Sequence, residues 1–157
     1  MAKVVIIMGS KADHEWSKKI KAHLEEFGIE VVMRISSAHK TPERCLEIIR
    51  EYESDDVVFI TVAGRSNALS GFVDAQTTKP VIACPPYSDK FAGADLFSSL
   101  RMPSGVAPMV VLEPEGAALA AVKIFALKDS SLNEKLLTYQ KKMKDKILEA
   151  DREVSGG

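Results

Sequence analysis

The sequence predicts an α/β fold in which a parallel sheet of five strands lies between two layers of helices. Short, uninterrupted apolar runs recur along the chain, as is typical of strands that are buried on both faces. Each run is followed by a polar turn and then by a stretch with helical apolar spacing. Alternation of this kind indicates βαβ crossovers. With 157 residues, the chain is expected to form one domain over residues 1–157.

The first half of the chain supplies three expected strands and two expected helices. The strands cover residues 4–8, 30–35 and 57–62. The first helix opens at Asp13 and ends at Gly28, a residue type that often terminates helices. The second helix begins at Thr41 and Pro42, because Thr is a common N-cap and Pro is tolerated in the first helical turn.

The second half continues the same alternation and adds one long helix at the end. The expected strands cover residues 80–84 and 107–112, and the expected helices cover residues 68–76, 92–100, 115–127 and 131–153. Five strands in this pattern favour a flavodoxin-like, doubly wound, three-layer α/β/α sandwich with an extra C-terminal helix. The last helix carries an apolar stripe through Leu132, Leu136, Met143 and Ile147.

Composition excludes several classes of function. The net charge is −1, whereas nucleic-acid-binding domains usually carry a basic surplus, so no nucleic-acid partner is expected. Cys45 and Cys84 are far apart and lack further ligands at zinc spacing. The apolar runs are too short to span a membrane. We interpret the N-terminal run as a buried strand of a cytoplasmic protein rather than as a signal peptide.

Polar residues follow the first expected strand, where a doubly wound sheet binds its ligands. Gly9 and Ser10 precede a helix and offer backbone N–H groups and a hydroxyl to an anion. Asp13 would repel a phosphate but suits the two hydroxyls of a ribose. The alternative is that Ser10 or Asp13 only caps the helix.

The loop after the second strand combines an imidazole with a cation and hydroxyls at another helix N-terminus. Ser37 and Lys40 are candidates for a phosphate site beside Ala38. Histidine is the side chain whose unperturbed pKa, about 6.5, lies near neutral pH, so His39 is the candidate for proton transfer. The alternative is an incidental surface histidine. His14 and His23 fall within the first helix and are weaker candidates.

The third loop holds Gly64, Arg65, Ser66 and Asn67. The glycine permits a ligand to approach the backbone closely, and the other three side chains supply hydrogen-bond donors. Capping of the next helix is again the alternative. Residues 85–88 and 100–105 are possible walls of the site or plain connections. The sequence has no Gly-rich dinucleotide, P-loop or nucleophile-elbow motif, and it has no cluster of metal ligands. Proton transfer is therefore the simplest expected chemistry.

Five segments together resemble the PurE family of purine biosynthesis. They are residues 8–13 (MGSKAD), 37–42 (SAHKTP), 63–67 (AGRSN), 79–82 (KPVI) and 98–105 (SSLRMPSG). The family has two classes. The mutase class typically has Arg where this chain has Lys40, and it carries a second histidine where this chain has Ala68. The chain resembles class II, which carboxylates aminoimidazole ribonucleotide with CO2 directly; N-carboxyaminoimidazole ribonucleotide mutase activity is the alternative.

The resemblance implies a role for each candidate residue. Ser10, Ser37 and Lys40 would bind phosphate and Asp13 the ribose, while Gly64, Ser66 and Asn67 would line the imidazole end. His39 would carry the proton. The resemblance further implies no cofactor (neither metal, biotin nor ATP) and a homo-octamer whose last helix packs on neighbouring subunits. A rival from another class is a flavodoxin-like binding or regulatory module without catalysis.

Overall fold

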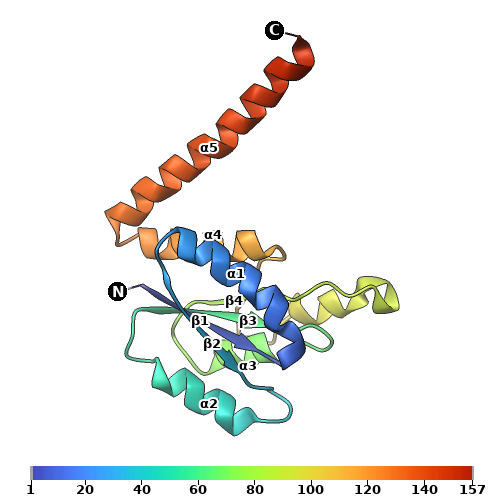
Figure 1. The fold of residues 1–157 in the computed structure, drawn as a ribbon. Helices are drawn as coiled ribbons and strands as arrows, with labels where there is room; N and C mark the ends of the chain where they lie inside the picture. The colour runs from blue at the N-terminus through green and yellow to red at the C-terminus, as the bar shows by residue number, and fades with distance from the viewer. Residues whose placement is uncertain (1, 157) are drawn as a thin grey trace. The chain divides into compact units, whose positions relative to one another are not determined.

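Five parallel strands form one sheet in the order β2-β1-β3-β4-β5 in a computed structural model, which describes residues 2–156 (Figure 1). The strands are β1 (Lys3–Met8), β2 (Glu30–Ile35), β3 (Val57–Val62), β4 (Val81–Ala83) and β5 (Met109–Val110). This order confirms the predicted flavodoxin-like, doubly wound sheet. The register aligns Met8 with both Ile35 and Val62. The loops that follow these three strands therefore start side by side.

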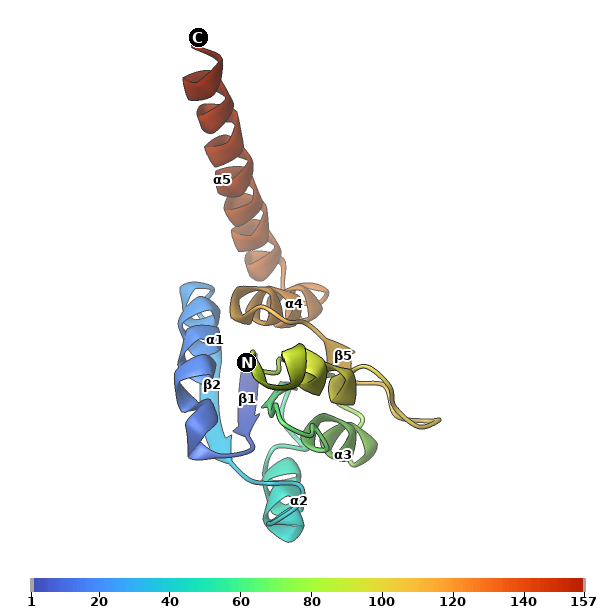
Figure 2. The ribbon, with the colours of Figure 1, turned by 90° about the vertical axis from the view of Figure 1, so that its right-hand side faces the viewer.

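Helices cover both faces of the sheet. The helical segments of the described chain are η1 (Lys11–Asp13), α1 (His14–Glu26), α2 (Pro42–Glu51), α3 (Leu69–Ala75), η2 (Lys90–Ser99), α4 (Pro114–Ala126) and α5 (Ser130–Ser155), where η marks 3₁₀-helix. Figures 1 and 2 show α1 over one face and α2 and α3 over the other. Helix bounds lie within a few residues of the predicted ones because apolar periodicity and Pro and Gly signals agree there.

Alternate residues of the central strands face opposite layers. Val5 and Ile7 of β1 pack with Cys45 and Ile48 of α2 and with Phe59 of β3 in one buried cluster. All six residues of β3 are buried, as its uninterrupted apolar run predicted. These strands form the rigid base from which the three polar loops extend.

The chain after β4 departs from the prediction. Residues 92–100 were expected to form a regular helix, but η2 is a 3₁₀-helix interrupted by Phe91, Ala92 and Gly93, whose φ angles are 49°, 53° and 76°. Left-handed backbone is unfavourable for Phe and Ala, and the exposed side chains of Phe91 and Ala92 gave no sequence signal for it. β4 and β5 are also shorter than expected, and β5 is an edge strand with one neighbour.

The chain divides into two compact units, with the boundary between Ala121 and Val122 inside α4. The second unit contains α5, which begins where the carboxylate of Asp129 accepts the backbone N–H of Ser131 at 2.9 Å. Leu132 and Leu136 are buried, but Leu137, Ile147, Leu148 and Val154 are more than half exposed. Within residues 2–156, no helix is both long and apolar enough to cross a membrane.

Candidate functional site

The loops after β1, β2 and β3 line one open pocket of about 500 Å³, here called the main pocket. Every predicted site residue except Asn67 lines it: Gly9, Ser10, Asp13, Ser37, Ala38, His39, Lys40, Gly64, Arg65 and Ser66. These residues come from three segments that are separated by more than twenty residues in the sequence. The level ends of β1, β2 and β3 bring them together.

The first loop is held by the carboxylate of Asp13. Its Oδ2 accepts the backbone N–H of Ser10 at 3.1 Å, and the Ser10 hydroxyl lies 3.5 Å from the same oxygen. Burial raises the pKa of Asp13, and hydrogen bonds from Ser10 and Gly9 offset only part of that rise. Asp13 is therefore a capping residue and also a partly desolvated carboxylate that faces the main pocket.

The second loop is a closed turn with His39 and Lys40 at its exposed tip. The backbone N–H of Thr41 donates to the carbonyl of Ser37 at 2.8 Å, and the hydroxyl of Thr41 accepts the N–H of Ser37 at 2.9 Å. The Ser37 hydroxyl accepts the N–H of Lys40 at 3.1 Å. Thr41 thus stands at the predicted N-cap position of α2, but its hydroxyl closes the turn instead of capping the helix.

Asn67 lies outside the lining of the main pocket. It is 5% exposed, and its side chain joins two segments. Its Nδ2 donates to the Ser99 hydroxyl at 2.8 Å, and its Oδ1 accepts the N–H of Ser70 at 3.1 Å. The backbone N–H of Asn67 donates to the Ser98 hydroxyl at 2.9 Å. Asn67 therefore fixes the third loop to η2.

The segment after β4 contributes residues that the sequence did not identify. Pro86, Tyr87 and Ser88 line the main pocket, in agreement with the wall predicted for residues 85–88. Lys90 and Asp95 also line it. Both were missed because their segment was interpreted as an ordinary connection followed by a helix. Residues 100–105, the second predicted wall, are not among the residues that line the main pocket.

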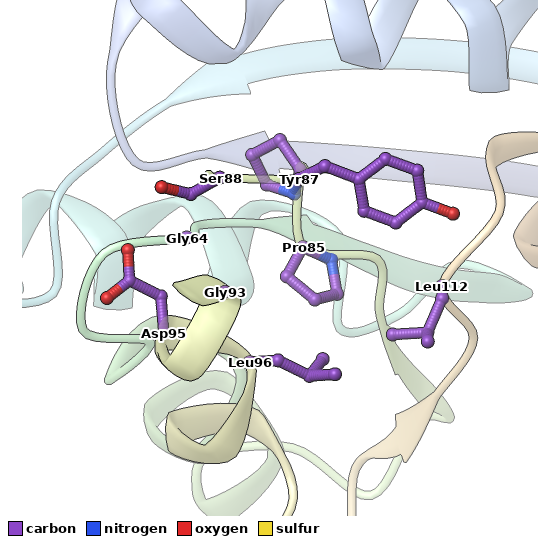
Figure 3. A pocket seen from close by; sticks show the side chains of 9 residues that line it. Gly64, Pro85, Tyr87, Ser88, Gly93, Asp95, Leu96 and Leu112 are labelled. Carbon is purple, nitrogen blue, oxygen red and sulfur yellow. The ribbon is translucent and has the colours of Figure 1, made fainter. Parts of the chain in front are cut away.

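A second hollow of about 270 Å³, here called the side cavity, adjoins the main pocket (Figure 3). The two share Gly64, Pro86, Tyr87, Ser88 and Asp95. The remaining lining residues of the side cavity are Pro85, Gly93, Leu96 and Leu112. In Figure 3 the side chains of Leu96 and Leu112 point toward one another, and the Asp95 carboxylate lies at the end nearer Gly64.

The two cysteines lie apart from both hollows. Cys45 and Cys84 are fully buried free thiols, and desolvation raises the pKa of each to about 11. A thiol with that pKa is almost entirely protonated at neutral pH and is a poor nucleophile. Among residues 2–156 there is no group of three or more His, Cys, Asp or Glu side chains placed to hold a metal.

The fold is a doubly wound α/β sandwich, and an imidazole, an ammonium group and a carboxylate line the main pocket at its strand ends, an arrangement typical of enzymes that act on small polar ligands. Residues 3–146 match the family described as AIR carboxylase, and the chain belongs to this family. The resemblance to the PurE family that the loop motifs indicated is thereby confirmed.

Individual relatives agree with this assignment. The chain is 68% identical over 152 residues to a phosphoribosylaminoimidazole carboxylase of Archaeoglobus fulgidus, covering 97% of this chain and 84% of the relative. It is 50% identical over 153 residues to a phosphoribosylaminoimidazole carboxylase of Treponema denticola, covering 96% of each chain. The crystal structure of Treponema denticola PurE is similar to this fold with a TM-score of 0.95, covering 98% of each chain.

Proposed function

We propose that this chain is a phosphoribosylaminoimidazole carboxylase, which reversibly carboxylates 5-aminoimidazole ribonucleotide with CO2 at ring carbon C4, and that His39 carries the proton. The observation that carries the residue assignment is the convergence of His39, Lys40 and Asp13 on one pocket. The class of reaction rests on the relatives, both of which bear the carboxylase name.

The proposed reaction needs one base and a CO2 molecule held next to C4. The exocyclic amino group of the substrate donates electron density to C4, which attacks the carbon of CO2. One C–O π pair moves to oxygen, and the tetrahedral C4 then carries a hydrogen and a carboxylate. His39 takes that proton, and the C–H bonding pair restores the aromatic ring. Positioned proton transfer of this kind contributes about 10²–10⁴-fold. In the reverse direction, protonated His39 returns the proton to C4 and CO2 leaves.

The pocket geometry supports a distribution of binding roles. The hydroxyls of Ser10 and Ser37 and the Lys40 ammonium group suit the phosphate, with Gly9 and Ala38 beside them in the lining. Asp13 faces the same pocket, and its carboxylate suits the ribose hydroxyls. A dianionic phosphate beside the exposed Lys40 is a charge-assisted contact, which is stronger than one between neutral groups.

The third loop suits the heterocycle. Gly64 lets the ring approach the backbone, since a side chain there would occupy the space beside Pro86. Arg65 and Ser66 offer donors to the carboxylate that forms at C4. We propose that Asn67, which does not line the pocket, positions this loop through Ser99 and Ser70.

The assay that tests the proposal is bicarbonate-dependent carboxylation of aminoimidazole ribonucleotide. We expect His39→Asn to lower kcat by at least about 10²-fold, because the base is lost, with ribonucleotide affinity largely retained. We expect Lys40→Ala to raise KM, because the phosphate loses its cation. His23→Asn is the matched control, since His23 lies in α1, outside both hollows.

Two results would overturn the assignment. Near-normal rates in His39→Asn would remove His39 as proton carrier. Turnover with N-carboxyaminoimidazole ribonucleotide, but none with aminoimidazole ribonucleotide plus bicarbonate, would replace the carboxylase by the mutase.

We further propose that the chain works as a single-domain subunit of a cytoplasmic homo-octamer in which α5 packs on neighbouring subunits. The exposed side chains of Leu137, Ile147 and Leu148 support a partner for α5, since exposed apolar side chains clustered on one element commonly mark an interface. Two free buried cysteines fit a reducing compartment. Light scattering tests the octamer: a monomer, or an unchanged oligomer in Ile147→Glu, would exclude this role of α5.

A further inference from the structure

We infer that Trp16 is a positioning residue for ribonucleotide binding, because its side chain ties one wall of the main pocket to the helix that begins at another. The tied wall is residues 85–88, here called the 85–88 wall, and the helix is α1, which begins directly after Asp13. Asp13 and residues 86–88 line the main pocket, whereas Trp16 lines neither hollow. This inference rests on the proposed function and adds to it a residue that acts on substrate affinity without touching the substrate.

The indole of Trp16 holds the chain at the point where the 85–88 wall begins. Its Nε1 donates to the backbone carbonyl of Cys84 at 3.0 Å. Cys84 is fully buried, and a buried carbonyl needs a donor. The next two residues, Pro85 and Pro86, have no N–H with which their own backbone could fasten the wall. A side chain from another element therefore fastens this part of the chain, and that side chain is Trp16.

The ring of Trp16 also packs against the middle of the 85–88 wall. Its centroid lies 5.1 Å from that of Tyr87 with 66° between the ring planes, a T-shaped arrangement that favours aromatic pairs. The Tyr87 hydroxyl donates to the Glu113 carboxylate. In Figure 3 the side chains of Tyr87 and Ser88 leave the chain in opposite directions. The contacts of Tyr87 therefore determine where Ser88 stands in the lining of the main pocket.

Trp16 is itself fixed on α1 close to Asp13. The Ser17 hydroxyl donates to the carbonyl of Asp13 at 2.9 Å, and Ser17 is fully buried. Lys19 Nζ lies 5.4 Å from the ring centroid of Trp16, which is a cation–π contact across one helical turn. The start of α1 therefore carries both the carboxylate that we propose for the ribose and the indole that holds the 85–88 wall. One side chain thus sets the separation of these two parts of the main pocket.

A wall that is held in one position raises affinity without contacting the ligand. If the 85–88 wall stands in the binding position for only part of the time, the apparent dissociation constant rises by the inverse of that fraction. Once bound, the ribonucleotide itself holds the wall, and Trp16 lies outside the lining of the pocket where the reaction occurs. Loss of Trp16 should therefore act on KM and leave kcat nearly unchanged.

The kinetic test compares two substitutions of Trp16 in the bicarbonate-dependent assay. We expect Trp16→Phe, which keeps a ring but loses the N–H, to raise the KM for aminoimidazole ribonucleotide about threefold. Trp16→Leu also loses the ring contact, and we expect it to raise this KM about tenfold or more. We expect kcat to stay within about twofold in both variants. An unchanged KM in Trp16→Leu, or a fall in kcat at constant KM, would overturn the inference.

Ile20→Val is the matched control for a general loss of stability. Ile20 is buried in α1, as part of the same helix, and lines neither hollow. The variant should lower Tm, because a buried methyl group is lost, and leave KM within about twofold. If KM rose in Ile20→Val as much as in Trp16→Leu, Trp16 would only stabilise the fold, and the inference would be wrong.

A second readout needs no turnover. The sequence contains one tryptophan, so the fluorescence of the chain reports on the contact between Trp16 and the 85–88 wall. We expect aminoimidazole ribonucleotide, added without bicarbonate, to change the emission saturably and with the midpoint that calorimetry gives, because the bound ligand holds the wall. Binding seen by calorimetry without a change in emission would contradict the inference. Failure of the proposed function looks different, because the natural chain would then not carboxylate the ribonucleotide, whatever its emission shows.

Discussion

Replacement of Asn67 by alanine tests whether the third loop depends on a buried amide. The change removes two side-chain hydrogen bonds, one to the Ser99 hydroxyl at 2.8 Å and one from the N–H of Ser70 at 3.1 Å. Ser99 and Ser70 are 1% and 0% exposed, so water cannot easily replace the lost partner. A buried polar group left without a partner costs about 1–3 kcal/mol, which gives about 2–6 kcal/mol for the pair.

Thermal unfolding at one fixed protein concentration measures this loss. For a chain of this size, 1 kcal/mol shifts Tm by about 2–4 °C, so a loss of about 3 kcal/mol lowers Tm by about 6–12 °C. Asn133→Ala is the matched control because Asn133 lies exposed in α5, where the same change should stay within about 0.5 kcal/mol. A double-mutant cycle of Asn67→Ala with Ser99→Ala isolates the direct bond, with an expected coupling of about 1 kcal/mol.

The same variant distinguishes positioning from direct binding. Because Asn67 holds the loop that carries Gly64 and Ser66, we expect the KM for the ribonucleotide to rise in both Asn67→Ala and Ser99→Ala. A Tm shift below about 2 °C, or a KM change in Asn67→Ala without one in Ser99→Ala, would refute the reasoning, since the amide would then act on the ligand itself.

Three further predictions follow from single features of the structure. Burial raises the pKa of Asp13 above its usual 3.8, so the carboxyl group binds its proton more tightly in the folded chain than in the unfolded chain. The stability of the natural chain relative to Asp13→Asn should therefore fall as pH rises from about 4 through the raised pKa, which Tm measured against pH would show. Cys45 and Cys84, each with a pKa of about 11, should resist iodoacetamide at pH 8 in the folded chain and react after denaturation, followed by mass spectrometry. Ala92 has a φ of 53°, a left-handed angle that glycine adopts more readily than alanine. Ala92→Gly should therefore raise the free energy of unfolding by up to about 1 kcal/mol in urea titrations, whereas Ala→Gly usually lowers it.

The main pocket could be predicted from the sequence because its position follows from strand ends. Buried parallel strands appear in a sequence as apolar runs. The loops that begin after Met8 and Val62 therefore mark the edge of the sheet where ligands bind. Gly9, His39 and Gly64 were assigned from that rule. No side-chain geometry was needed, since parallel strands in register bring their following loops together.

The segment after β4 could not be predicted in the same way. Its backbone depends on contacts that are distant in the sequence, such as the Ser98 hydroxyl, which accepts the N–H of Asn67 at 2.9 Å. Left-handed φ angles at Phe91 and Ala92 have no local signal, because glycine is the usual residue there. Asp95 and Lys90 were missed for this reason, although charged residues after Pro-Pro could have suggested a loop instead of a helix.

The contacts of Asp13 bear on the choice between capping and ligand binding. Both hydrogen bonds with Ser10 use the Oδ2 oxygen, so capping does not require Oδ1. Desolvation is the largest influence on the pKa of Asp13 and disfavours the carboxylate in the folded chain. The amide oxygen of an Asn at this position could accept the same N–H of Ser10 without burying a charge. The charge of Asp13 is unfavourable for folding, faces the main pocket and is not needed for the cap. A ligand whose hydroxyls donate hydrogen bonds to this carboxylate explains the charge better than the helix alone does.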